Sequence, residues 1–181
     1  MRHALIAVLW LALPAYAAEW RSTAASEFTF RVTFEGEPIA GEFRDFEVSL
    51  ELDPACLDAA ALLVRVDLRA ADMGDPDMND VLFDAAWFDT QQFAAAVFAS
   101  DAITEHAPGQ FIATGMLDLK GTVRRVTVPF SWTHSGDAAT MQGRFVVKRT
   151  DFEVGSGEWA TDDAIGIDVE LDFTVHLLPE D

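Results

Sequence analysis

The sequence predicts an all-β protein: an eight-stranded antiparallel, lipocalin-like barrel with one or two short helices in the connection around residues 70–92. Apolar and polar residues alternate in eight segments, and a period of two places successive side chains on opposite faces of a strand. Most of the segments are joined by short turns. Each segment has one apolar and one charged face, so one face of the sheet meets water. A single sheet of this kind hides its edges by closing into a barrel.

The alternation is clear from the first segment, where Phe28, Phe30, Val32 and Phe34 are separated by polar residues. It is most regular in the last segment, where seven apolar residues alternate with polar ones. We expect eight strands, at residues 28–34, 46–52, 62–68, 96–104, 111–120, 123–132, 139–148 and 165–177.

The connections support antiparallel neighbours. Pro108-Gly109, Gly121-Thr122 and Ser135-Gly136-Asp137 are short turn sequences, which join adjacent antiparallel strands. The longer connection could form short helices at residues 78–83 and 85–88.

The first residues have the pattern of a cleaved leader. A weakly positive start is followed by an apolar run, Pro14 and the small-residue signal Ala15-Tyr16-Ala17. The apolar run is too short to cross a bilayer. We therefore expect a signal peptide at residues 1–18, a single barrel domain at residues 19–181, and a periplasmic location.

The charge of the chain excludes several partners. The formal net charge is -19, and removing Arg2 with the leader gives -20. Such a chain repels nucleic acid and anionic membrane surfaces, so neither a nucleic-acid partner nor stable membrane insertion is expected. Cys56 is the only cysteine, so no intrachain disulfide can form.

The interior is expected to be apolar. The chain has 14 Phe and 1 Tyr, and the Tyr lies in the leader. A sugar or nucleotide pocket needs convergent polar groups, whereas an apolar tube suits a hydrocarbon chain and gains about 0.8 kcal/mol per buried CH₂. Phenylalanines at a period of two also build an ordinary core, so a packed interior and a cavity both remain open. Trp87 and Phe88 are expected to cover one mouth of the barrel. The residues expected to line the interior are Phe28, Phe30, Phe46, Val48, Val64, Val66, Trp87, Phe88, Phe98, Leu117, Leu119, Val128, Phe130, Phe145, Val169, Leu171 and Phe173.

The sequence offers no positive signal for catalysis or for a metal. The three histidines outside the leader have no zinc-site spacing. Asp75, Asp77 and Asn79 match the start of a calcium-binding loop, but the pattern fails at Asp80 and Ala86. We therefore expect no enzyme activity, no metal and no cofactor other than a bound isoprenoid quinone or other lipid as ligand.

Short motifs along residues 20–177 resemble those of the YceI-like family of exported lipid- and polyisoprenoid-binding proteins. The resemblance implies an elongated eight-stranded barrel with a long apolar tail in its lumen, no catalytic residues, and in some relatives an association with membrane cytochromes of the b561 type. The motifs that carry it are Ser26-x-Phe28-x-Phe30, Gly41-x-Phe43-x-x-Phe46, Trp87-Phe88-Asp89, Gly115-x-Leu117-x-Leu119-Lys120-Gly121 and Arg149-x-Asp151-Phe152-x-Val154-Gly155.

The chain departs from many relatives at two points, one of which is Ala94, where many have Pro. Many relatives carry an Arg-Asp pair with a nearby His ahead of the aromatic turn, where this chain reads Met78-Asn79-Asp80-Val81-Leu82. The departure disfavours a pyrophosphate head and favours a neutral one, such as a quinone or an amide. The first hypothesis is a monomeric or homodimeric periplasmic carrier of a quinone-like or polyprenyl isoprenoid or another long-chain lipid. The alternatives are a filled barrel that acts as a partner module of a membrane protein such as a b561-type cytochrome, and an unrecognised enzyme.

Overall fold

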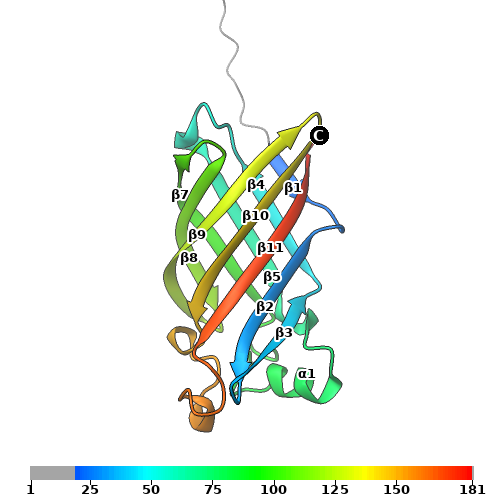
Figure 1. Cartoon of the computed structure of the whole chain (residues 1–181), viewed down its shortest axis with the longest axis vertical. Coiled ribbons are helices and arrows are strands. Elements are labelled where there is room, and N and C mark those ends of the chain that lie inside the picture. The colour runs from blue at the N-terminus through cyan, green and yellow to red at the C-terminus, as the bar shows by residue number, and fades with distance from the viewer. Residues whose placement is uncertain (1–18, 181) are drawn as a thin grey trace, which may run out of the picture.

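The computed structural model describes residues 19–180 and shows an elongated antiparallel barrel (Figure 1). The predicted leader lies outside the described residues and stays a prediction. The strands are β1 (Glu19–Ser22), β2 (Glu27–Phe34), β3 (Glu37–Phe43), β4 (Phe46–Glu51), β5 (Ala61–Asp67), β6 (Ala71–Asp72), β7 (Ala95–Ala107), β8 (Gln110–Leu119), β9 (Thr122–Ser135), β10 (Ala138–Lys148) and β11 (Asp168–Pro179).

The sheet closes through its first and last strands. Strand order runs β1-β4-β5-β7-β8-β9-β10-β11, and β11 pairs again with β1. Trp20 lies opposite Leu50 of β4 on one side and opposite Pro179 of β11 on the other. The predicted eight-stranded antiparallel barrel is confirmed.

Three short strands complete the wall at one end. The edge of β11 pairs with β1 through its last residues and with β2 through Glu170–Thr174, so β1 and β2 follow one another along the same edge. In the same way β3 pairs with β2, and β6 pairs with β3. We call the end that contains Trp20 and Leu177 the terminal end, and the end that contains α1 (Pro76–Phe83) and the β2–β3 turn the helix end (Figure 1).

All eight predicted strands form, with ends shifted by a few residues, while β1, β3 and β6 were not predicted. The sequence of β3 hides its alternation, because Gly41 stands at an inward position where an apolar side chain would be expected. A Cβ at Gly41 would lie 2.4 Å from Cζ of Phe30, so the glycine makes room for that ring.

One of the two predicted helices forms. α1 begins at Pro76, and the Asp75 carboxylate caps it by accepting hydrogen bonds from the backbone N–H groups of Asp77 and Met78. The helix predicted at residues 85–88 is wrong. These residues form turns, in which Phe88 N–H donates back to Leu82 O at 3.0 Å. None of the helices within residues 19–180 is long and apolar enough to cross a membrane.

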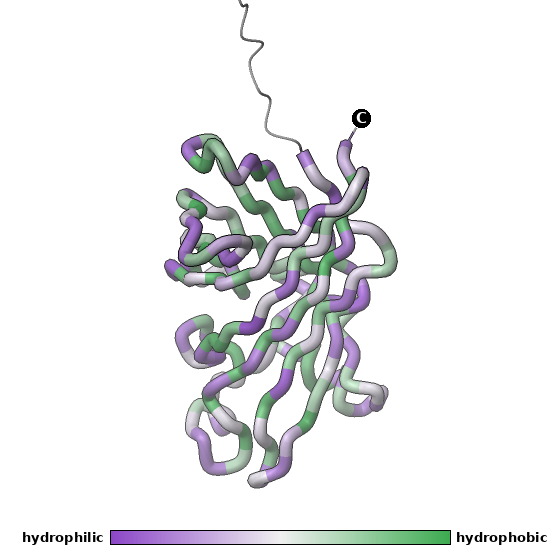
Figure 2. The backbone as a smooth tube through the Cα atoms, turned by 45° about the horizontal axis from the view of Figure 1, so that its top comes forward, coloured by the Kyte–Doolittle hydropathy of each residue, from purple (hydrophilic) through white to green (hydrophobic). Residues whose placement is uncertain are grey.

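Hydrophilic and hydrophobic residues alternate along the strands, as the colours of Figure 2 show. The buried core residues on the strands are apolar, and exposed apolar residues such as Leu63, Val123 and Val146 are exceptions to the outward polar face. The terminal end is densely packed. Leu50, Phe111, Phe130 and Leu177 are almost fully buried there, and the ring of Trp20 meets the ring of Trp132 edge-on at 5.2 Å. Side chains therefore fill this half of the barrel.

Candidate ligand site: an apolar cavity in the helix-end half

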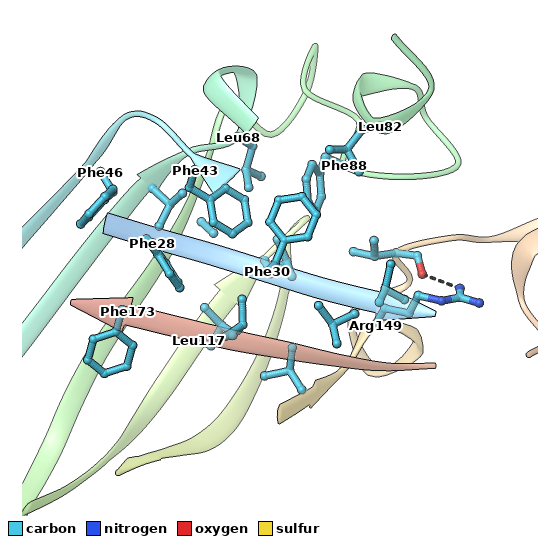
Figure 3. Close-up of a pocket in the computed structure, with 18 of the residues that line it drawn as sticks. Phe28, Phe30, Phe43, Phe46, Leu68, Leu82, Phe88, Leu117, Arg149 and Phe173 are labelled. Carbon is cyan, nitrogen blue, oxygen red and sulfur yellow. Dashed lines mark hydrogen bonds between the residues drawn. The ribbon is translucent and has the colours of Figure 1, made fainter. Parts of the chain in front are cut away.

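The helix-end half of the barrel contains a cavity of about 480 Å³. This volume lies within the range of pockets that hold one small ligand. Its walls are almost entirely hydrocarbon, and Asp77 and Arg149 are the only charged residues among those that line it. Figure 3 shows the phenylalanine rings that converge on it from β2, β3, β4 and β11.

Inward-pointing side chains in this half are less buried than those at the terminal end. Phe28, Phe46, Val64 and Phe145 line the cavity and are only partly buried, because each packs against core side chains on one side and borders open space on the other. Leu50, in contrast, has no exposed surface. The two interpretations of the sequence are therefore both realised, with a packed core in one half of the barrel and a cavity in the other.

The cavity ends short of the terminal end on β4, β9, β10 and β11. Its innermost lining residues are Val48 on β4, Val128 on β9, Met141 on β10 and Val175 on β11. The next inward residue toward the terminal end does not line the cavity on any of these strands; these residues are Leu50, Phe130, Ala139 and Leu177, all buried. They form the floor of the cavity, which limits how deep a ligand can reach.

The structure places every predicted lining residue on the cavity wall except Phe130, which lies in the packed half just beyond the floor. Trp87 and Phe88 are buried parts of the wall rather than a cover over a mouth. Whether these side chains touch a ligand stays a prediction. Some lining residues belong to the same period-two pattern and could have been named from it, namely Val126, Met141, Val147, Ile165 and Val175. Others carry no such signal: Met78 and Val81 lie in α1, and Met73, Val154 and Trp159 lie outside the barrel strands.

Segment 73–94 completes the wall where the sheet is interrupted. β6 is the last strand in the order and pairs only with β3, so the wall beyond it needs another cover. Leu82, Trp87 and Phe88 of this segment are buried against residues of the barrel such as Phe30. The segment is anchored to the opposite loop, because Ala86 O accepts hydrogen bonds from the N–H groups of residues 155 and 156 at 2.9 and 2.8 Å.

Arg149 organises that loop, which spans residues 149–167 between β10 and β11. Its side chain is only 3% exposed and donates to five backbone carbonyls, while its guanidinium lies over the ring of Trp87. Burial lowers the pKa of Arg149, but an arginine keeps its charge in proteins. The donors are therefore already satisfied, and Figure 3 shows one of these hydrogen bonds. The accepting carbonyls, at 2.8 to 3.2 Å, are those of Val154, Gly155, Thr161, Ile165 and Gly166.

The described chain shows no second centre of reactive groups. Within residues 19–180, no three His, Cys, Asp or Glu side chains are grouped so that they could hold a metal ion. Cys56 is an exposed, free thiol. The candidate site is therefore the cavity itself.

A closed antiparallel barrel with an apolar cavity open to one end defines a lipocalin-like binding fold. The YceI-like domain family matches residues 21–177, and the chain belongs to this family. The resemblance stated from the sequence motifs is thus confirmed.

Solved structures show the same fold. BcnA from Burkholderia cenocepacia is 29% identical, with a TM-score of 0.82 over 86% of this chain and 98% of that one. A polyisoprenoid binding domain from Saccharophagus degradans, implicated in plant cell wall breakdown, is 16% identical, with a TM-score of 0.73 over 91% and 99% of the two chains. The YceI protein of Campylobacter jejuni is 16% identical, with a TM-score of 0.66 over 78% and 84%. No protein with a curated description matches this chain.

Proposed function

We propose that this protein is a periplasmic binding protein that carries an isoprenoid, quinone-like or polyprenyl, or another long-chain lipid in its barrel. The single observation that carries the proposal is the cavity of about 480 Å³ with walls of hydrocarbon. Binding, rather than catalysis, is the chemistry that such walls support, because carbon surfaces offer neither acid–base groups nor a nucleophile to a substrate.

The mechanism is sequestration. A tail that leaves water for the cavity gains about 0.8 kcal/mol per buried CH₂, so ten buried carbons contribute about 8 kcal/mol. The cost of association is subtracted from this gain, so tight binding needs a longer tail or further contacts. The floor formed by Leu50, Phe130 and Leu177 sets the depth available to the tail. Affinity therefore depends on tail length up to the floor and levels off beyond it.

Two further observations support the ligand class and the location. The structural relative from Saccharophagus degradans is described as a polyisoprenoid binding domain, and its fold covers nearly all of this chain. The leader pattern at residues 1–18 supports export to the periplasm.

The test is to purify the mature chain without detergent and identify what it holds. Mass spectrometry of an organic extract should detect a long-chain lipid at a stoichiometry near one per protein, absent from a mock purification. Refolded, delipidated protein should then bind an alkyl chain in titration calorimetry with a negative heat-capacity change, the mark of apolar burial. An empty extract together with no binding of any alkyl chain would overturn the proposal.

A further inference from the structure

We propose that the cavity takes an amphiphile with a cationic head, a protonated amine or a quaternary ammonium, which stays at the mouth beside Asp77 while the tail fills the cavity. This inference rests on the proposed function and specifies the head group of its ligand. It also rejects anionic heads such as phosphate, pyrophosphate and carboxylate.

The head cannot enter the cavity. A charged or strongly polar group without hydrogen-bond partners is costly to bury, and the walls present carbon almost everywhere. Arg149 is the only cation among the lining residues, and its guanidinium already serves five carbonyls. An anionic head therefore finds no free positive partner inside.

The mouth must lie at the helix end, since packed side chains fill the terminal end. Met78 and Val81 of α1 line the cavity and are 42% and 44% exposed, so they belong to its rim. Asp77 stands beside them, is exposed, and is the only carboxylate among the lining residues. A tail that enters along Met78 and Val81 leaves its head next to Asp77.

The Asp77 carboxylate is free to meet a cation. Within the described chain it accepts no hydrogen bond and forms no ion pair, whereas the neighbouring Asp75 carboxylate is used to cap α1. Asp75 therefore has a structural role, whereas the charge of Asp77 is available to a ligand.

Further acids surround Asp77 at this end. Glu35 lies at the tip of the β2–β3 turn, Asp80 and Asp84 lie on and after α1, and Asp162 lies in the loop after β10; all are exposed. None of these four acids forms an ion pair in the described residues. The ion pairs there join other acids to arginines.

Two lysines lie at the same end without neutralising the mouth. Lys120 donates to the backbone oxygen of Glu153 at 2.8 Å, and Lys148 is exposed and next to the inward Val147, so it points outward from β10. Arg124 of β9 adds a third cation at this end, because it lies opposite the lining residue Leu117, is exposed, and forms no ion pair among the described residues. The acids outnumber these three cations, so the field at the mouth is negative, which attracts cations and repels anions.

The experiment compares three ligands with the same tail: dodecyltrimethylammonium, dodecanol and dodecyl sulfate, each below its micelle concentration, with dodecylamine as a second cation. Titration calorimetry on delipidated mature protein should give the ammonium an affinity about five- to tenfold above that of the alcohol at low salt, with the sulfate weakest. At about 0.5 M salt this preference should shrink to less than about twofold, because exposed charges are screened. Equal affinity for both cations would assign the preference to charge; binding of the amine alone would assign it to hydrogen-bond donation and overturn the ionic form of the proposal.

Asp77→Asn should lower the ammonium-to-alcohol preference about threefold and leave dodecanol binding unchanged. The matched control is Asp58→Asn, because Asp58 is also an exposed acid in the first turn of a short helix, η1 (Leu57–Ala59), away from the cavity lining. It should leave the preference unchanged.

Equal affinity of all heads at low salt would overturn the head-group inference while leaving the apolar carrier in place. Failure of every dodecyl ligand to bind would instead overturn the proposed function. An equal loss of preference in Asp77→Asn and Asp58→Asn would show that net charge, rather than the rim, selects the head.

Discussion

The guanidinium carbon of Arg149 lies 5.6 Å from the centre of the Trp87 ring. This contact joins the loop after β10 to segment 73–94, two parts of the wall that are far apart in the sequence. Gly155 packs between them, since a Cβ there would lie 2.2 Å from Nη1 of Arg149 and 3.4 Å from Cη2 of Trp87. The helix end therefore depends on a single buried cation for its shape.

We predict that Arg149→Lys lowers the free energy of unfolding by about 3 kcal/mol, because a lysine has three donors on one nitrogen and leaves several buried carbonyls without a partner. Urea denaturation measures the loss, and hydrogen exchange should show faster opening of residues 153–166. The control Arg144→Lys alters an exposed ion pair with Asp172 and should cost less than about 1 kcal/mol. Similar losses in the two variants would contradict this role of Arg149.

We predict that Val128→Trp shortens the longest tail that the protein binds, because Val128 lines the innermost part of the cavity. Overpacking should cost about 1–3 kcal/mol of stability and leave the protein folded. Binding of alcohols of increasing chain length measures the effect, and affinity should level off at a shorter chain than in the parent protein. Val123→Trp, on the outer face of the same strand, is the control and should change nothing. An unchanged chain-length profile in folded Val128→Trp would place Val128 away from the ligand.

The strands and their inward faces follow from the sequence because each strand has one wet face, which forces a period of two. The closure of the barrel through β1 could not be predicted from the sequence. β1 has only four residues, and their pattern is too short to be told apart from the predicted leader beside them. Gly41 makes room for the ring of Phe30 and so breaks the apolar alternation of β3. This strand was therefore not predicted either.

The position of the cavity could not be derived from the strands. Val128 and Phe130 both face inward from β9, two residues apart. Val128 lines the cavity, whereas Phe130 belongs to the floor. The difference arises from the rings of Phe111 and Trp132, which fill the space around Phe130 from neighbouring positions. The residues of α1 on the rim could not be predicted for another reason, because an eight-residue helix is too short to indicate which of its sides faces a ligand.

We predict an acid-dependent contribution from Asp67, at the end of β5. Hydrogen bonds from the Arg69 side chain lower the pKa of Asp67 from 3.8 to about 2. A depressed pKa stabilises the folded state above the unfolded pKa, so the contribution is complete above about pH 4 and is lost as the pH falls toward 2. Because the pair is partly solvated, we expect about 1 kcal/mol. Unfolding of the parent protein and Asp67→Asn should therefore differ at pH 6 and converge near pH 2; a constant difference would contradict the linkage.

We predict that lipid transfer between anionic vesicles and the protein speeds up, or at least does not slow, as salt rises. Without the predicted leader the net charge is -20, which opposes approach, and salt shortens the Debye length from about 10 Å at 0.1 M to about 3 Å at 1 M. Arg124 and Arg125 form an exposed basic pair on β9, but Arg125 is engaged by Asp101. Stopped-flow transfer of a fluorescent lipid measures the rate. A steep loss of transfer with salt, abolished by Arg124→Gln, would show that a local basic surface docks the protein.

The pairing of Trp20 with Pro179 determines when the barrel can first hold a ligand. These partners lie at opposite ends of the described chain, so the last seam of the wall can form only after the final strand has been made and has reached the first. A nascent or partly translocated chain has neither β11 nor the seam, and its interior faces water along the whole missing side. We therefore predict that a chain cut before β11 holds no ligand, because the side of the barrel that β11 closes stays open to water.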